Sequence, residues 1–142
     1  MSATNVQFTV AAHIMATLGF HYGDELPSSM LPGSIHADPS FVRKSLSKLS
    51  KAGLVVARRG KGGASLLARP PRKITLLDIY RASAAPPAFA IHDYPVEKRC
   101  SVSCNFKTSM STFLKQAQTS FEKSLARITL ADVVAEIRKN NH

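Results

Sequence analysis

The apolar residues at the beginning of the chain recur at helical spacing. Apolar side chains follow one another every three or four positions over about residues 5–18, which predicts a first helix. A polar break is expected at 19–27, where Gly, Asp and Pro interrupt the pattern. A short second helix is expected near 28–35, although a Pro-Gly pair within it weakens that pattern.

A third helix follows a typical start signal. Residues 36–39 form a predicted turn, in which Asp38 is the expected N-cap and Pro39 the first helical residue. The helix is expected to end at Gly53, a residue that suits the C′ position. Its inner face is expected to bury three apolar side chains spaced four and three residues apart, namely Val42, Leu46 and Leu49.

An extended pattern comes directly after this helix. Residues 54–59 are rich in β-branched side chains and too few for a helix, so they predict a strand. A glycine-rich turn at 60–63 and a returning strand at 64–68 complete a predicted hairpin. Three helices followed by a two-stranded wing predict a winged helix-turn-helix, and we place this DNA-binding region at residues 1–73.

Two similar helix starts lie in the second half of the chain. Thr75 with Asp78, and Thr129 with Asp132, match the capping-box arrangement with Asp in place of Glu. We interpret them as two similar helix starts and not as a repeated domain. The helices that follow them are expected at about 76–84 and 130–139.

A Pro-rich loop at 84–99 leads into a long predicted helix at about 105–127. The helix carries a single apolar stripe, made of Phe106, Met110, Phe113, Ala117, Phe121 and Leu125. This stripe exceeds what a small domain needs to cover itself, so we expect a homodimer. Residues 74–142 are thus expected to hold a helical linker, a sensor loop (about 84–104) and a dimerisation helix. The expected fold is mainly α, with a small β-hairpin wing.

Charge is concentrated in one part of the chain. Between Asp38 and Asp78 lie 39 residues with ten Lys or Arg and no Asp or Glu, whereas the rest of the chain is balanced. The formal net charge of +10 therefore comes from this window. A localised positive field suggests a polyanion partner, nucleic acid first. We expect double-stranded DNA, because Phe41 is the window's only aromatic residue and RNA binding relies on base stacking.

Length and composition exclude several classes of protein. The 142 residues suit one domain, or one domain with a dimerisation appendage. We expect a cytoplasmic protein, because the chain shows no membrane-length apolar run and no signal-peptide pattern. We expect no enzyme, because no catalytic triad, metalloprotease motif, paired carboxylates or nucleotide-binding loop is found. A small-molecule or metal sensor with incidental DNA affinity is the rival interpretation.

The exposed face of the third helix is the first candidate DNA contact. In helix-turn-helix proteins the second helix of the motif lies in the major groove, where its N-terminal side chains reach base edges. Ser40, Arg43 and Lys44 occupy the first turns, and Arg43 could fork onto a guanine. Contacts to phosphate are expected from Ser47, Lys48 and Lys51. The alternative, that these are solvated helix charges, is disfavoured by the basic hairpin directly afterwards.

The wing is the second candidate DNA contact. Arg58 and Arg59 lead into a tip that contains Lys61, Gly62 and Gly63. Neighbouring strand residues point to opposite faces, so we favour Arg59, beside the tip, as the arginine that enters a narrow minor groove. A nucleotide-binding loop is disfavoured, because the glycines are not followed by Lys-Ser/Thr and a helix start.

Three motifs resemble those of the Rrf2 family of bacterial transcription regulators. They are KLSKAGLV at 48–55, RRGKGGASLLARP at 58–70 and ITLLDI at 74–79, and the resemblance extends along almost the whole chain. It implies a dimeric winged-helix protein whose long helix pairs across a two-fold axis. It also implies DNA contacts from the start of the recognition helix and from the wing, here Pro39, Ser40, Arg43 and Arg59.

The same resemblance bears on the cysteines. Many members of the family ligate an iron–sulfur cluster with three cysteines in the loop before the long helix. Here that loop supplies only Cys100 and Cys104, whereas a cluster usually needs four ligands. His92 could add a ligand, but nothing in the sequence fixes it there. We therefore expect no cofactor and keep an iron–sulfur cluster as the alternative.

Three further interpretations of the two cysteines stay open. They form a redox-sensing pair, since Lys98 and Arg99 adjoin Cys100 and Cys104 lies near a helix N-terminus, settings that favour the reactive thiolate. Alternatively, they hold zinc or another metal with histidines, although Cys-x3-Cys alone is half a site. In the third interpretation they are inert. The sequence thus predicts a dimeric repressor of a roughly palindromic operator, with thiol-based redox sensing as its regulation.

Overall fold

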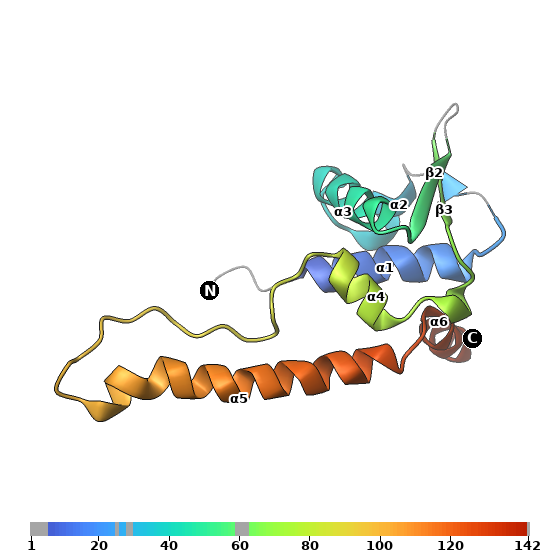
Figure 1. The fold of residues 1–142 in the computed structure, drawn as a ribbon. Helices are drawn as coiled ribbons and strands as arrows, with labels where there is room; N and C mark the ends of the chain where they lie inside the picture. The colour runs from blue at the N-terminus through green and yellow to red at the C-terminus, as the bar shows by residue number, and fades with distance from the viewer. Residues whose placement is uncertain (1–5, 25, 28–29, 59–62, 142) are drawn as a thin grey trace.

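The computed structural model describes residues 6–24, 26–27, 30–58 and 63–141. A helical unit with a small sheet stands at one end of the molecule, and a long helix extends away from it (Figure 1). In chain order the elements are α1 (Gln7–Phe20), β1 (Leu26–Pro27), α2 (Leu31–Ile35), α3 (Pro39–Lys51), β2 (Val55–Arg58), β3 (Ala64–Leu67), the 3-10 turn η2 (Pro71–Lys73), α4 (Leu76–Ala82), α5 (Ser101–Ala126) and α6 (Leu130–Asn140).

The predicted winged helix-turn-helix is confirmed. Strands β2 and β3 pair antiparallel, from Val55 opposite Leu67 to Arg58 opposite Ala64. The two-residue strand β1 pairs with the other edge of β3, giving the strand order β1-β3-β2. Sequence patterns did not predict β1, because two residues are too few to show alternation and one of them is Pro27.

The predicted end of α3 is confirmed in detail. Gly53 adopts a φ of 78°, in the left-handed region that glycine enters without strain. Its N–H donates to the Ser50 carbonyl and the N–H of Leu54 donates to the Leu49 carbonyl, both at 3.0 Å. These two bonds satisfy carbonyls that a helix end leaves without partners. At the other end, Asp38 is the N-cap and Pro39 is in the first turn, although no capping bond to the Asp38 carboxylate is found among the described residues.

One core unites the first helices with α4 and α6. Ile14, Leu49, Ile79 and Leu130 are fully buried and belong to a single cluster. On the inner face of α3, Val42 and Leu49 are buried as expected, whereas Leu46 is only partly buried. The last helix therefore helps to complete the core of the winged unit.

The break predicted at 19–27 was placed too early in the sequence, because α1 continues to Phe20. Gly19 is buried where α6 crosses α1. A Cβ atom added there would lie 3.0 Å from Val134 Cγ2 and 3.3 Å from Leu130 Cδ2. Glycine at this position thus permits a close approach of two helices and does not end the first one.

The two predicted capping boxes are both present, and the segments that carry them lie side by side. In each box the Thr hydroxyl accepts from the Asp N–H at 3.0 Å, and the Asp carboxylate accepts from the Thr N–H at 2.9 Å. Thr75 and Thr129 form an antiparallel bridge. The Leu76 N–H donates to the Ile128 carbonyl at 2.8 Å, and the Leu130 N–H donates to the Ile74 carbonyl at 2.7 Å. The similar sequences thus form a nearly symmetric pair of helix starts.

The long predicted helix begins four residues earlier than expected. Helix α5 starts at Ser101 with Cys100 as its N-cap, so Cys104 lies within its first turns. The chain between α4 and α5 has no helix or strand and runs back along α5 (Figure 1). In the part of the chain that the structure describes, no helix is both long and apolar enough to cross a membrane.

Candidate nucleic-acid interface and thiol pair

The outer face of α3 is polar and open to solvent. Burial of Val42 and Leu49 fixes which side of the helix faces the core. The opposite side exposes most of the predicted contact residues, namely Pro39, Ser40, Arg43, Lys44, Ser47 and Lys51. α3 and the β2–β3 hairpin lie at the same end of the molecule, remote from the far end of α5 (Figure 1). The fold therefore brings the two predicted DNA-contacting elements together.

Lys48 differs from its neighbours on this face. It is only partly exposed, and its ammonium group donates to the Ser83 carbonyl at the end of α4, at 3.5 Å. Lys44 and Lys48 both line a cavity of about 320 Å³ between α1, α3 and the end of α4, whose other lining residues include Phe41 and Gln7. Lys48 thus contacts α4 as well as bordering the polar face, a contact that no local sequence pattern indicates.

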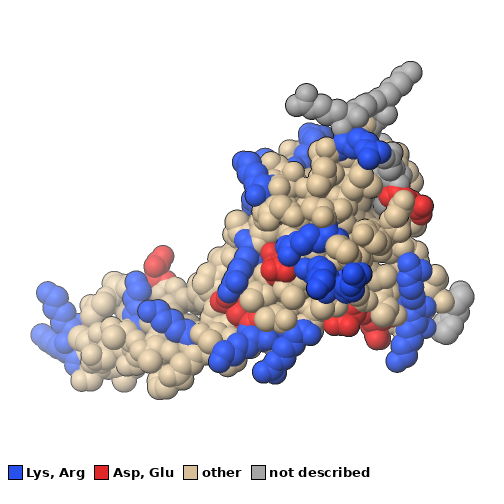
Figure 2. Space-filling model, turned by 45° about the vertical axis from the view of Figure 1, so that its right-hand side comes forward, with Lys and Arg blue, Asp and Glu red and all other residues tan. Residues whose placement is uncertain are grey.

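The wing is described up to its tip. Arg58 is exposed at the end of β2, and Gly63 has a φ of 55° that favours glycine at the start of the returning strand. Three of the predicted wing contacts, Arg59, Lys61 and Gly62, lie outside the described residues. Lys and Arg side chains lie near the hairpin, and others are spread along the molecule as far as its opposite end (Figure 2).

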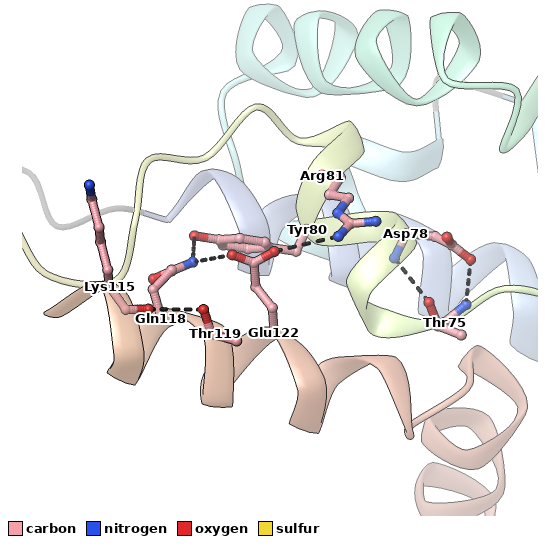
Figure 3. Close-up of polar contacts among 8 residues, drawn as sticks. All are labelled: Thr75, Asp78, Tyr80, Arg81, Lys115, Gln118, Thr119 and Glu122. Atoms are coloured by element: carbon pink, nitrogen blue, oxygen red, sulfur yellow. Dashed lines mark hydrogen bonds and ion pairs between the residues drawn. The ribbon is translucent and has the colours of Figure 1, made fainter. Parts of the chain in front are cut away.

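The contact between α4 and α5 centres on Tyr80. Its ring meets Phe8 of α1 and Phe121 of α5 edge-on, each with ring centres 5.4 Å apart. Its hydroxyl donates to the Pro86 carbonyl at 2.7 Å and accepts from Gln118 Nε2 at 3.0 Å (Figure 3). Tyr80 therefore connects the winged unit, the loop after α4 and α5.

Gln118 extends this contact along α5. Its Nε2 also lies 3.1 Å from Glu122 Oε2, and its Oε1 accepts from the Ala88 N–H at 2.9 Å. Arg81 pairs with Glu122 at 3.6 Å (Figure 3). We call Tyr80, Gln118, Phe121 and Glu122 the α4–α5 joint. No local sequence pattern indicates the joint, because Tyr80 lies 38 to 42 positions before its partners on α5.

The two cysteines lie at the far end of α5, and both are free and exposed. The sulfur of Cys100, the N-cap, accepts the Ser103 N–H at 3.4 Å. The sulfur of Cys104 instead donates towards two carbonyl oxygens, that of Glu97 at 3.7 Å and that of Lys98 at 3.6 Å. The expected position of Cys104 near a helix N-terminus is confirmed, although it lies within α5 and not in the loop before it. The two sulfurs have opposite hydrogen-bonding roles.

A cavity of about 520 Å³ opens beside Cys104. Its lining includes His92, Tyr94 and Lys107. The His92 ring lies 5.1 Å from that of Tyr94 and 6.0 Å from that of Phe106. The Tyr94 hydroxyl donates to the Ser103 carbonyl at 3.0 Å and accepts from the Lys107 N–H at 3.2 Å. The fold thus holds His92 near the thiol pair, which the sequence could not establish.

The donor set at the cysteines does not fit an iron–sulfur cluster. Within the described residues, no group of three or more His, Cys, Asp or Glu side chains is arranged to hold a metal ion. The chain has two cysteines in all, and a cluster usually takes four protein ligands.

The residues of the predicted apolar stripe on α5 differ in burial. Leu125 is buried in the joint region and Phe121 is half-buried against Tyr80. Phe106 and Met110 are half-buried, whereas Phe113 and Ala117 in the middle of the helix are exposed. Three more large apolar residues are exposed in this part of the described chain, Val102 at the start of the helix and Phe89 and Val96 in the preceding loop.

A helical core, a β-hairpin and a long helix define the fold of the chain as a winged helix-turn-helix. The family model Rrf2, described as an iron-dependent transcriptional regulator, matches residues 4–136. The chain therefore belongs to the Rrf2 family, as its motifs predicted.

Individual relatives agree with this assignment. The chain is 31% identical over 131 residues to the "Putative HTH-type transcriptional regulator YwnA" of Bacillus subtilis (strain 168), covering 92% of this chain and 96% of the relative. A "putative transcriptional regulator" from Lactobacillus plantarum has the same fold, with a TM-score of 0.77, 24% identity and coverage of 98% and 93% of the two chains. The structure of T. potens IscR is similar at a TM-score of 0.73, with 21% identity and coverage of 99% and 91%.

Proposed function

We propose that this Rrf2-family transcription regulator is a cytoplasmic, dimeric repressor that binds a roughly palindromic operator in duplex DNA. The observation that carries the proposal is the exposed polar face of α3 beside Arg58 of the wing. Both belong to the window that contains ten Lys or Arg residues and no Asp or Glu. Such a surface attracts phosphate oxygens and offers side chains to base edges.

The residues divide by role. Arg43, near the start of α3, is placed to reach a base edge, together with Pro39 and Ser40. Phosphate contacts come from Lys44, Ser47, Lys48 and Lys51. In the wing, Arg58, Arg59, Lys61, Gly62 and Gly63 approach the minor groove, with Arg59 as the inserted side chain. In this division, residues 1–73 read the DNA and residues 74–142 carry the sensor loop and the dimerisation helix, while α6 completes the core.

The dimer forms through α5. The exposed Phe113 and Ala117 support this proposal, since an apolar strip in the middle of a long helix calls for a covering partner. The half-buried Phe106 and Met110 extend the contact, whereas Phe121 packs against Tyr80 and Leu125 is buried within one chain. A two-fold axis between two copies would place the recognition helices in half-sites about 34–36 Å apart on one face of the DNA.

The regulatory signal is proposed to be oxidation of Cys100 and Cys104. Two exposed thiols at the start of the dimerisation helix are accessible to oxidants. Their oxidation would alter the first turn of α5 and the end of the sensor loop that precedes it. We propose no catalytic activity for this chain.

The test is a binding assay with an operator selected from random duplexes. We expect fluorescence anisotropy to show tight binding that single-stranded competitor does not reverse. The affinity should fall steeply with salt, because the slope of log K against log salt concentration is about −0.9 for each phosphate neutralised. Arg43→Ala should weaken binding to the selected operator by about 1–3 kcal/mol. Lys73→Ala, outside both contacting elements, is the control. Equal small losses from the two variants, or salt-independent binding, would contradict the proposal.

A further inference from the structure

The two thiols differ in the polarity of their surroundings. An N–H donor, such as that of Ser103 on the Cys100 sulfur at 3.4 Å, stabilises negative charge on the atom that accepts it. Cys100 also stands at the N-terminus of a 26-residue helix, the end with partial positive charge. The carbonyls of Glu97 and Lys98 that face the Cys104 sulfur oppose negative charge there. The Cys100 sulfur thus faces a hydrogen-bond donor, and the Cys104 sulfur faces two acceptors.

The two side chains are also near each other. A helical side chain leans towards the helix N-terminus, so that of Cys104 lies over the turn that begins at Cys100. The Cys104 sulfur and the Cys100 N–H both point at one acceptor, the Glu97 carbonyl, at 3.7 and 2.9 Å. Residues four apart within a helix have Cβ atoms about 5–6 Å apart, and Cys100 is the N-cap just before the helix. A disulfide needs about 3.5–4.5 Å, so the first turn of α5 must open for the bond to form.

We infer that Cys100 is the thiol that reacts with a hydroperoxide and that Cys104 resolves the product into a disulfide within one chain; this inference rests on the redox-sensing function proposed above. The Cys100 thiolate attacks the peroxide, the O–O bond breaks, and the leaving oxygen takes a proton and departs as water or an alcohol. The Cys100 sulfenic acid is then attacked by the Cys104 sulfur. The S–O bond breaks, and its hydroxyl leaves as water with the thiol proton. The thiol pair loses two electrons and the peroxide gains them.

Closing the disulfide would change the start of α5. Opening the first turn breaks the hydrogen bond from the Cys104 N–H to the Cys100 carbonyl, now 3.0 Å, and the Ser103 bond to the Cys100 sulfur. Ser103 is also where the sensor loop is fastened. Its hydroxyl accepts the Glu97 N–H at 2.8 Å and its carbonyl accepts the Tyr94 hydroxyl at 3.0 Å. Oxidation would therefore loosen the loop whose other end contacts the α4–α5 joint.

The test follows each sulfur separately in the full-length, reduced protein. Wild type, Cys100→Ser and Cys104→Ser are treated with hydrogen peroxide in the presence of dimedone, which traps sulfenic acids, and then digested with trypsin. Cleavage after Arg99 and Lys107 releases one peptide, 100–107, that contains both cysteines. We expect the wild-type peptide to lose the mass of two hydrogen atoms. Cys104→Ser should accumulate dimedone on Cys100, at least about tenfold faster than Cys100→Ser accumulates it on Cys104.

The outcomes separate the inference from the function on which it rests. Both thiols are exposed, so serine in either place is compatible with the fold, and a melting curve checks this. Trapping on Cys104 that is as fast as on Cys100, or a disulfide that links two subunits on a non-reducing gel, would overturn the inference. If peroxide still weakened DNA binding in that case, redox sensing would stand. Two thiols inert to peroxide would overturn both.

Discussion

The winged unit and α5 bury their apolar side chains in opposite ways. In the unit, Ile14, Leu49 and Ile79 are fully buried in one core. In α5, by contrast, Leu125 is the only buried residue of 26, and Phe113 is 62% exposed. A single chain therefore buries the apolar side chains of the winged unit but covers α5 only in part. The winged unit therefore has a core of its own, whereas the exposed apolar residues of α5 are what the proposed dimer would cover.

The strongest test of this contrast is Phe113→Asp. A charge in the middle of a dimer contact would be buried without a counter-ion, so we expect sedimentation to show a monomer. DNA affinity should then fall about 100-fold or more, because two linked recognition helices bind far more tightly than one. Ile137→Asp, at a 40% exposed apolar residue on α6, is the matched control. A Phe113→Asp protein that remains dimeric would contradict the proposed role of α5.

A second test compares buried and exposed apolar residues directly. Leu49→Ala leaves a cavity in the core and should lower the free energy of unfolding by about 2–5 kcal/mol. Val102→Ala, at a residue that is 69% exposed on α5, should change it by less than about 0.5 kcal/mol. Urea unfolding measures both. Similar losses would mean that α5 belongs to the same cooperative core, and the contrast between the two regions would fail.

Local signals explain what the sequence could predict. The end of α3 at Gly53 and the two capping boxes are encoded within a few residues, and all three are confirmed. Gly19 was misjudged because its role depends on Leu130 and Val134, more than 100 positions away. The pairing of Thr75 with Thr129 was missed for the same reason, although the similarity of the two segments was visible.

The candidate site shows the same division. Periodicity predicted most of the α3 residues that face solvent, with Lys48 as an exception because it also contacts Ser83. The position of Cys104 near a helix start followed from the same kind of local pattern. The opposite hydrogen-bonding roles of Cys100 and Cys104 depend on where the Glu97 and Lys98 carbonyls point, which no residue pattern encodes. Specific DNA contacts stay predictions, because a base contact depends on the DNA partner as much as on the exposed side chain.

The smallest effect is expected at the α4–α5 joint, where the two regions meet. Gln118→Ala removes hydrogen bonds to Tyr80, Glu122 and the Ala88 N–H (Figure 3). Each such bond contributes about 0.5–1.5 kcal/mol, and water can replace part of what is lost, so we expect a local loss of about 1–2 kcal/mol. The amide of Ala88 should then exchange its hydrogen about 5–30-fold faster.

Thr119→Ala is the matched control for this change, because it is the next residue on α5 and its hydroxyl donates within the helix, to the Lys115 carbonyl at 3.0 Å (Figure 3). If both variants left the exchange of Ala88 unchanged, the joint would not hold the loop. If Gln118→Ala speeds that exchange while the core amides of α1 and α3 keep their protection, then the loop opens without the winged unit. That result would make the joint the boundary between a region stable in one chain and a region free to respond to the thiols.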